Sequence, residues 1–252
     1  MKCPKCGADQ RDESPECSRC GIVFEKYRAY LESRERDGHS ETAALGDPDA
    51  QETGGLWNSL KEYVLFVEPR VNPFHLVGRI LVYLLLFFWG WKFILTPMES
   101  NYVGSSFLHA VNLPFHEAGH VIFSFLGEFM GVLGGFLGQL IMPLVCFGAL
   151  LFGTRDPFGA SAALWWTAES LMDSAPYIND ARAQVLILLG GVTGREAPGF
   201  HDWNNLLGRL GLLPHAHAIA RTVYSLGIAL MLVTFLWGAV LLYRQYKNVE
   251  SL

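Results

Sequence analysis

Hydrophobic residues are concentrated in the C-terminal two-thirds of the chain, in long runs separated by short polar segments. Because about 20 apolar residues cross the hydrocarbon core of a bilayer, these runs predict membrane-spanning helices, the fourth of them somewhat short. They cover residues 76–95, 107–126, 132–152, 159–175 and 222–243. Residues 183–192 are too few to cross alone and are expected to be re-entrant or buried, although a sixth crossing within residues 183–210 stays open. The pattern predicts a mainly α-helical, polytopic membrane bundle of five or six spans.

The N-terminal part of the chain differs in composition and divides into three segments. Residues 1–32 combine paired cysteines with apolar positions at helical spacing, which predicts a small metal-bound module and a short helix. Residues 33–55 are rich in Gly, Pro, Asp, Glu and Ser and predict a flexible linker. Residues 56–73 predict a juxtamembrane amphipathic segment or, alternatively, a longer linker. Residues 74–246 then form the integral membrane domain.

The chain ends and the charge bear on location and partners. The sequence starts Met-Lys-Cys-Pro without an apolar stretch behind it, so we expect no secretory signal and a cytosolic N-terminus. Five spans would then place Arg244 and Lys247 outside the cytosol, although basic residues prefer the cytosolic side, and a sixth crossing would remove this conflict. The net charge of −5, without a basic stripe, gives no sign of nucleic-acid binding, so the lipid bilayer is the expected surrounding.

Four of the five cysteines lie within the first 20 residues, in two C-x2-C pairs that are each followed by glycine. The thiolates of these four can complete a closed, structural zinc site; they are Cys3, Cys6, Cys17 and Cys20. Two disulfides are the alternative, which a cytosolic location disfavours. The segment resembles a zinc ribbon, and such ribbons bind proteins or nucleic acids, so we expect a cytosolic partner that the sequence does not identify. Cys146 lies in an apolar run and is expected to be buried.

The second apolar run is interrupted by the segment His116-Glu117-Ala118-Gly119-His120. Residues four apart share one face of an α-helix, so His116 and His120 can bind one metal ion, and Glu117 can reach a water on it. Zinc hydrolases use this arrangement. Ionisable groups in a membrane helix are costly and usually functional, which favours a metal site. The alternative is a polar cluster that is hydrogen-bonded between helices without a metal.

A zinc hydrolase needs a third protein ligand and an open fourth position for water. The downstream candidates for this ligand are Glu169, Asp173, Asp180, His201 and Asp202. Asp202 has two other interpretations, as a helix cap or as a carboxylate that orients a ligand imidazole.

Glycine recurs at four-residue intervals over residues 127–138. This spacing favours close helix packing, because small residues allow two backbones to approach. The alternative is a non-helical backbone that pairs with an extended peptide beside the metal site.

The membrane part of the chain resembles the site-2 protease family of intramembrane zinc metalloproteases. That family has H-E-x-x-H in one membrane helix and a later Asn-x-x-Pro…Leu-Asp-Gly segment whose aspartate binds zinc. Residues 173–182, Asp-Ser-Ala-Pro-Tyr-Ile-Asn-Asp-Ala-Arg, can be aligned with that segment with one gap, so that Pro176 matches its proline and Asp180 its ligand. The chain departs from the pattern by having Asp173 for the asparagine and Asn-Asp-Ala for Leu-Asp-Gly.

The resemblance implies an intramembrane zinc endopeptidase. Its expected partner is a membrane-embedded protein, either as its substrate or as its regulator. The metal ligands that it implies are His116, His120 and Asp180, with Asp173, His201 and Asp202 as alternatives. Glu117 would be the general base, and Asn112 or Asn179 would donate to the oxyanion. With the ribbon, the chain would bind two zinc ions, one structural and one in the membrane domain.

The alternative function is a non-catalytic metal-binding membrane protein, such as a sensor, an assembly factor or a transporter. The departure from Leu-Asp-Gly supports this alternative. A site closed by four protein ligands would favour it too; such a set would be His116, His120, Asp180 and His201. Transport would also require a polar path through the bundle, and the predicted spans contain few polar residues away from the motif.

Overall fold

The computed structural model describes residues 3, 9, 15–17, 22–28, 58 and 60–249, and the chain divides into two compact units, Met1–Asn58 and Ser59–Leu252. In the N-terminal unit, Cys3, Cys17 and Phe24 are buried in one small apolar cluster. Cys6, Cys20 and the linker predicted over residues 33–55 lie outside the described residues. The ribbon and its structural zinc therefore stay predictions.

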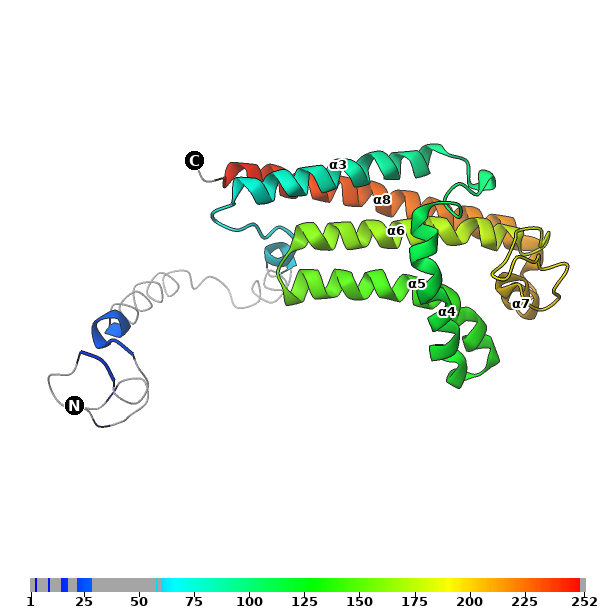
Figure 1. Cartoon of the computed structure of the whole chain (residues 1–252), viewed down its shortest axis with the longest axis horizontal. Helices are drawn as coiled ribbons and strands as arrows, with labels where there is room; N and C mark the ends of the chain where they lie inside the picture. The colour runs from blue at the N-terminus through cyan, green and yellow to red at the C-terminus, as the bar shows by residue number, and fades with distance from the viewer. Residues whose placement is uncertain are drawn as a thin grey trace, which may run out of the picture. The chain divides into compact units, whose positions relative to one another are not determined.

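The C-terminal unit is mainly helical, and four long helices lie lengthwise beside one another (Figure 1). They are α3 (Pro73–Leu95), α5 (Glu128–Gly148), α6 (Pro157–Asp180) and α8 (Ala216–Lys247). The shorter α4 (Phe107–Phe123) runs across the others, and α7 (Asp202–Arg209) lies at one end of the bundle (Figure 1). A π-helix, Ala149–Gly153, extends α5. Short 3-10 turns precede or follow other helices, at Met98–Ser100, Ser124–Leu126 and Leu213–His215.

Three helical segments are long and apolar enough to cross a membrane, Pro73–Leu95, Glu128–Gly153 and Leu213–Lys247. The other two predicted spans fall on α4 and α6, which differ in kind. Helix α4 has only 17 residues. Helix α6 packs against α3, α5 and α8 and buries most of its residues, polar ones included. Because its neighbours surround it, α6 can be less apolar than a helix that faces lipid.

The apolar run over residues 183–192 forms no helix. It belongs to the irregular segment between α6 and α7, and Val185, Ile187 and Leu189 are each more than half exposed. The expectation that this run is buried against the other helices is therefore wrong, and it is no sixth crossing. Its backbone is held by turns and by an isolated bridge between Ile187 and Thr193.

The residues before α3 and after α8 lie at the same end of the bundle (Figure 1). Val71 and Val249 form a parallel β-bridge, and the Val71 N–H donates to the Asn248 carbonyl at 2.9 Å. Arg244 donates to the Leu65 carbonyl at 3.1 Å. The chain therefore enters α3 and leaves α8 at the same end of the bundle.

Glycines bring α4 and α5 close together. A Cβ atom at Gly119 would overlap with the Gly134 carbonyl oxygen, and one at Gly138 would overlap with the Phe115 carbonyl oxygen. Both helices are regular at these positions. The glycine pattern thus serves helix packing, which was the favoured interpretation, rather than a non-helical backbone open to a peptide. This close approach also fixes where the α4 side chains stand against α5.

Candidate metal centre

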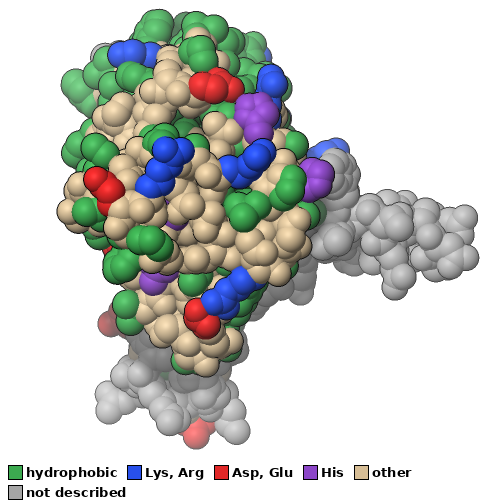
Figure 2. Space-filling view, turned by 90° about the vertical axis from the view of Figure 1, so that its right-hand side faces the viewer, with side chains coloured by type: hydrophobic (Ala, Val, Ile, Leu, Met, Phe, Trp, Pro, Cys, Tyr) green, Lys and Arg blue, Asp and Glu red, His purple; other side chains and the backbone are tan. Residues whose placement is uncertain are grey.

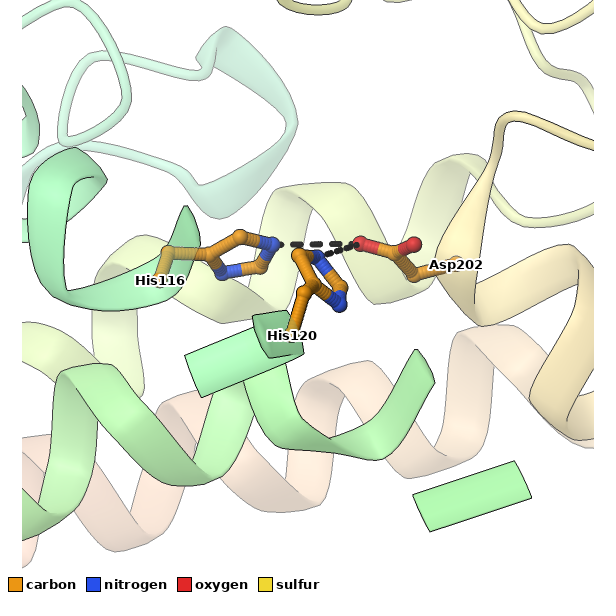
Figure 3. A group of neighbouring side chains, drawn as sticks. All are labelled: His116, His120 and Asp202. Atoms are coloured by element: carbon orange, nitrogen blue, oxygen red, sulfur yellow. Dashed lines mark hydrogen bonds and ion pairs between the residues drawn. The ribbon is translucent and has the colours of Figure 1, made fainter. Parts of the chain in front are cut away.

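The side chains of two histidines of α4 and one aspartate of α7 point toward one another (Figure 3). His116 Nε2 lies 3.1 Å and His120 Nε2 lies 3.3 Å from the same oxygen, Asp202 Oδ2. The three side chains are 13, 26 and 17 % exposed, so the group is largely buried but open on one side. Among the described residues, this is the group of His, Cys, Asp and Glu side chains that could hold a metal ion.

Hydrogen bonds to the Nδ1 atoms fix the orientation of both rings. His116 Nδ1 lies 3.0 Å from Gln139 Oε1, and His120 Nδ1 lies 2.8 Å from the Gly131 carbonyl. The Gln139 amide is itself oriented, because its Nε2 donates to the Ser170 carbonyl and to Ser174 Oγ at 3.1 and 2.8 Å. Both acceptors therefore require a proton on Nδ1, which leaves the Nε2 lone pairs directed at Asp202.

Two imidazole nitrogens and one carboxylate oxygen thus converge. A proton on Nε2 makes an ion pair with Asp202, as at His116, whereas two unprotonated Nε2 atoms and the carboxylate form a set of ligands for a metal ion. For a tetrahedral zinc ion with bonds of 2.0–2.1 Å, two ligand atoms are about 3.3 Å apart. The N–O distances of 3.1 and 3.3 Å agree with this separation. Outer hydrogen bonds from ligand imidazoles to carbonyl oxygens are also typical of zinc sites. The donor set therefore fits zinc.

Gly135 of α5 faces the same point. A Cβ atom there would lie 2.5 Å from His116 Nε2 and 2.6 Å from His120 Nε2, closer than real Cβ atoms come to other atoms. The missing side chain leaves the space that an ion between the two rings needs. Sequence reasoning assigned this glycine only to helix packing, since the spacing of glycines carries no sign of what each one faces.

Asp180, the preferred third ligand in the sequence, does not join this group. Its two oxygens accept the backbone N–H groups of Val185 and Leu186, at 3.0 and 2.9 Å. His201 Nε2 lies 3.4 Å from Asp180 Oδ2 without forming a hydrogen bond. Asp202, one of the alternative ligands, therefore lies beside the two histidines. Asp180 instead stabilises the start of the loop that leads to Asp202.

His201 caps α7, so the cap is His201 and not Asp202. Its Nδ1 accepts the Asn204 N–H at 3.2 Å, and its ring packs on Tyr177 with centroids 4.3 Å apart. The side chain is fully buried, and burial lowers the pKa of His201, although the Asp180 carboxylate acts in the opposite direction. The Asp202 N–H donates to the Tyr177 hydroxyl at 3.0 Å. These contacts hold Asp202 at the start of α7, facing α4.

The other nominated residues stand apart from the metal group. Asp173 and Glu169 belong to a second cluster with His109 and Asn112. Asn112 is therefore turned away from the histidine ligands, and Asn179 Oδ1 is 2.8 Å from His217 Nδ1. Neither asparagine faces the metal group, so the expected oxyanion donors are not found there.

Glu117 is half-buried, next to His116 in α4. Its carboxylate acts electrostatically on His120, and within the described residues it forms no hydrogen bond or ion pair. A carboxylate beside the ligands without another partner is available to exchange a proton with a water at the site.

The end of the bundle that carries α7 presents a mixed surface (Figure 2). Basic, acidic and histidine side chains are scattered over it between uncharged groups. Gln139 links His116 to Ser174, six residues before α6 ends, which corresponds to about 9 Å along a helix. Gln139 also donates to the Ser170 carbonyl, near the middle of α6, so the metal group is connected to the second half of that helix.

No protein-family model, curated protein or solved structure matches this chain. The resemblance to site-2 proteases thus rests on the residues alone. What the structure adds is independent of any relative, namely the convergence of His116, His120 and Asp202 from two helices that are far apart in sequence.

Proposed function

We propose that this protein is an intramembrane zinc endopeptidase, in which His116, His120 and Asp202 hold the metal. The observation that carries the proposal is the convergence of three possible ligand atoms near Glu117, whose carboxylate has no hydrogen-bond or ion-pair partner among the described residues. Three protein ligands leave a fourth position for water, as in catalytic zinc sites, whereas structural sites have four. The chain's long apolar helices support a membrane setting and a membrane-embedded substrate.

The chemistry follows from the residues beside the metal. Zinc, when bound, polarises the scissile carbonyl and lowers the pKa of water toward about 7. Glu117 accepts a proton as the water oxygen bonds to the carbonyl carbon, and it passes that proton to the nitrogen as the C–N bond breaks. A carboxylic acid and an amine leave the site. Asp202 keeps the histidine nitrogens in place through its position at the start of α7.

The position of the site supplies the water. A hydrolysis in the middle of a bilayer lacks water unless a polar cavity reaches it. Here Asp202 comes from α7, which lies at one end of the bundle (Figure 1), and the side chain of His120 is 26 % exposed. Water would enter at the exposed side of His120, and a membrane-embedded peptide would have to reach the same place to be cut.

The non-catalytic alternative has less support from the geometry. A closed site would use His201 as a fourth ligand, but His201 Nε2 faces Asp180 and its Nδ1 caps α7. Transport would use a polar path, and the buried polar residues of α6 are the feature that favours it. These residues are considered below as a separate site.

The test is cleavage of membrane-embedded model peptides by the zinc-loaded protein in bilayers. Glu117→Gln is expected to lose activity by about 10²- to 10⁴-fold, the usual contribution of a general base, while it keeps its zinc. Glu99→Gln, the same change at an exposed glutamate, is the matched control. Equal cleavage by the wild type and Glu117→Gln would refute the role of Glu117. A zinc-loaded wild type that cuts no peptide of a broad library would favour the non-catalytic alternative.

A further inference from the structure

A second polar cluster lies between α4 and α6. Asn112 Nδ2 donates to Glu169 Oε2 and to Asp173 Oδ2, both at 3.0 Å, and Asn112 Oδ1 accepts from Trp166 Nε1 at 2.7 Å. His109 Nδ1 lies 2.9 and 3.1 Å from the two Asp173 oxygens. Asn112, Glu169 and Asp173 are buried, and Glu169 is not exposed at all. One amide group thus holds two carboxyl groups, the carboxyl pair Glu169 and Asp173, inside the bundle.

Glu169 has one oxygen without a partner. Its Oε1 is buried and accepts no hydrogen bond from the described residues. The residue lies near the middle of the 24-residue α6, away from both ends of the bundle. A charged carboxylate with an unpartnered oxygen is costly in such surroundings, whereas the protonated carboxyl group has no net charge.

The groups around the carboxyl pair do not balance two negative charges. His109 of α4 is the ionisable group that contacts the pair, and one imidazolium can balance one carboxylate. From α5 the neighbouring polar group is the neutral Gln139, which donates to α6. The Tyr224 hydroxyl of α8 instead donates to the Phe93 carbonyl of α3. The α3 rings of Trp89 and Phe93 pack on Trp165 of α6, four residues before Glu169.

One further positive charge is therefore needed, and a proton fits better than a metal ion. Metal cations of the calcium and magnesium type take six or more oxygen ligands. In the described residues, no third His, Cys, Asp or Glu ligand atom completes a metal group at the carboxyl pair. A proton needs only the free Oε1.

We propose that the carboxyl pair is a proton-binding site inside the bundle, with one exchangeable proton on Glu169 Oε1. His109, whose side chain is 45 % exposed, is its outer member and connects it to the surroundings through Asp173. The proton is taken from water and returned to water, so no other reactant is required. This site is independent of the proposed peptidase activity.

The test is infrared spectroscopy of the full chain in bilayers at pH 7, followed over the carbonyl-stretching band of protonated carboxyl groups. The wild type is expected to show this band and Glu169→Gln to lose it, while Glu99→Gln keeps it. Asp173→Asn is expected to keep the band, and the pH at which the band disappears should differ from the wild type by about one unit or more, since the two groups interact. Thermal unfolding followed by circular dichroism serves as the control for folding. Glu169→Gln is expected to fold, because Gln can still accept from Asn112.

Three results would overturn the proposal. One is a wild type without the band at pH 7. Another is a band that survives in a folded Glu169→Gln protein, because the proton would then be elsewhere. The third is a band that disappears when sodium replaces choline in the buffer, which would show that a metal cation occupies the site.

Discussion

Replacing Gly135 by alanine tests the metal centre without removing any ligand. The new Cβ would lie 2.5 and 2.6 Å from the Nε2 atoms of His116 and His120, and real Cβ atoms essentially never come within 3.0 Å of other atoms. The His116 ring has to move by about 0.5 Å and the His120 ring by about 0.4 Å to reach 3.0 Å, whereas metal–ligand distances tolerate only about 0.2 Å. The rings cannot simply shift, because Gln139 and Gly131 hold their Nδ1 atoms.

Disturbing the groups that orient metal ligands costs about 10- to 100-fold in affinity. A displacement of both rings should reach the upper part of this range, about 100-fold, or about 2.7 kcal/mol. Gly148→Ala is the matched control, since it lies in the same helix and its Cβ would meet nothing within 4 Å. Titration with a zinc-competing chelator measures the affinity, and thermal unfolding without zinc measures the fold.

Gly135→Ala should weaken zinc binding and abolish peptide cleavage, while its unfolding temperature without zinc stays close to that of Gly148→Ala. Wild-type zinc affinity in Gly135→Ala would refute the argument that the ion lies between the two rings. Gly134→Ala should behave differently, because its Cβ would overlap with a backbone oxygen of α4 and so destabilise the fold itself.

Two further substitutions separate the ligands from their supports. Asp202→Asn should reduce the zinc content of the full chain by one equivalent. Asp180→Asn should weaken zinc binding less, because Asp180 acts only through the loop that carries Asp202. A metal analysis in which Asp180→Asn loses more zinc than Asp202→Asn would restore Asp180 as the ligand. Gln139→Leu removes the acceptor that orients His116 and should reduce zinc affinity by about 10- to 100-fold, measured by chelator competition, with Gln245→Leu in α8 as a buried-glutamine control. Equal affinities of these two variants would show that the His116 ring needs no outer partner.

Hydropathy alone predicts α3, α5 and α8, because a helix that faces lipid has to be apolar along its length. It also marks residues 159–175, but it cannot tell that α6 lies inside the bundle, where neighbouring helices rather than lipid meet its polar side chains. For residues 183–192, hydropathy is misleading in the opposite direction, because an apolar segment is exposed. Its apolar composition predicts burial, whereas turns and backbone hydrogen bonds to Asp180 keep it exposed at the end of the bundle.

The centre was predictable where it depends on helical spacing. Four-residue spacing brings His116 and His120 together, as expected. The third position depends on how the loop of residues 181–201 folds back, which no local pattern encodes. An alignment with the family's aspartate selected Asp180, but its oxygens are engaged by backbone N–H groups. Gln139 could have been identified from the sequence, because it is a lone amide side chain in an apolar run.

The central position of α6 explains why two polar clusters can exist in one bundle. Ser170 is shared between them, because its carbonyl accepts from Gln139, which orients His116, and its hydroxyl lies 3.4 Å from Asn112 Oδ1. Asn112 in turn holds the carboxyl pair. Since buried polar groups are costly unless each has a partner, a change at one cluster has to be accommodated at the other through Ser170. The polar residues of α6 are thus better understood as one hydrogen-bonded network than as a transport path, and this network connects the candidate metal group to the proposed proton site.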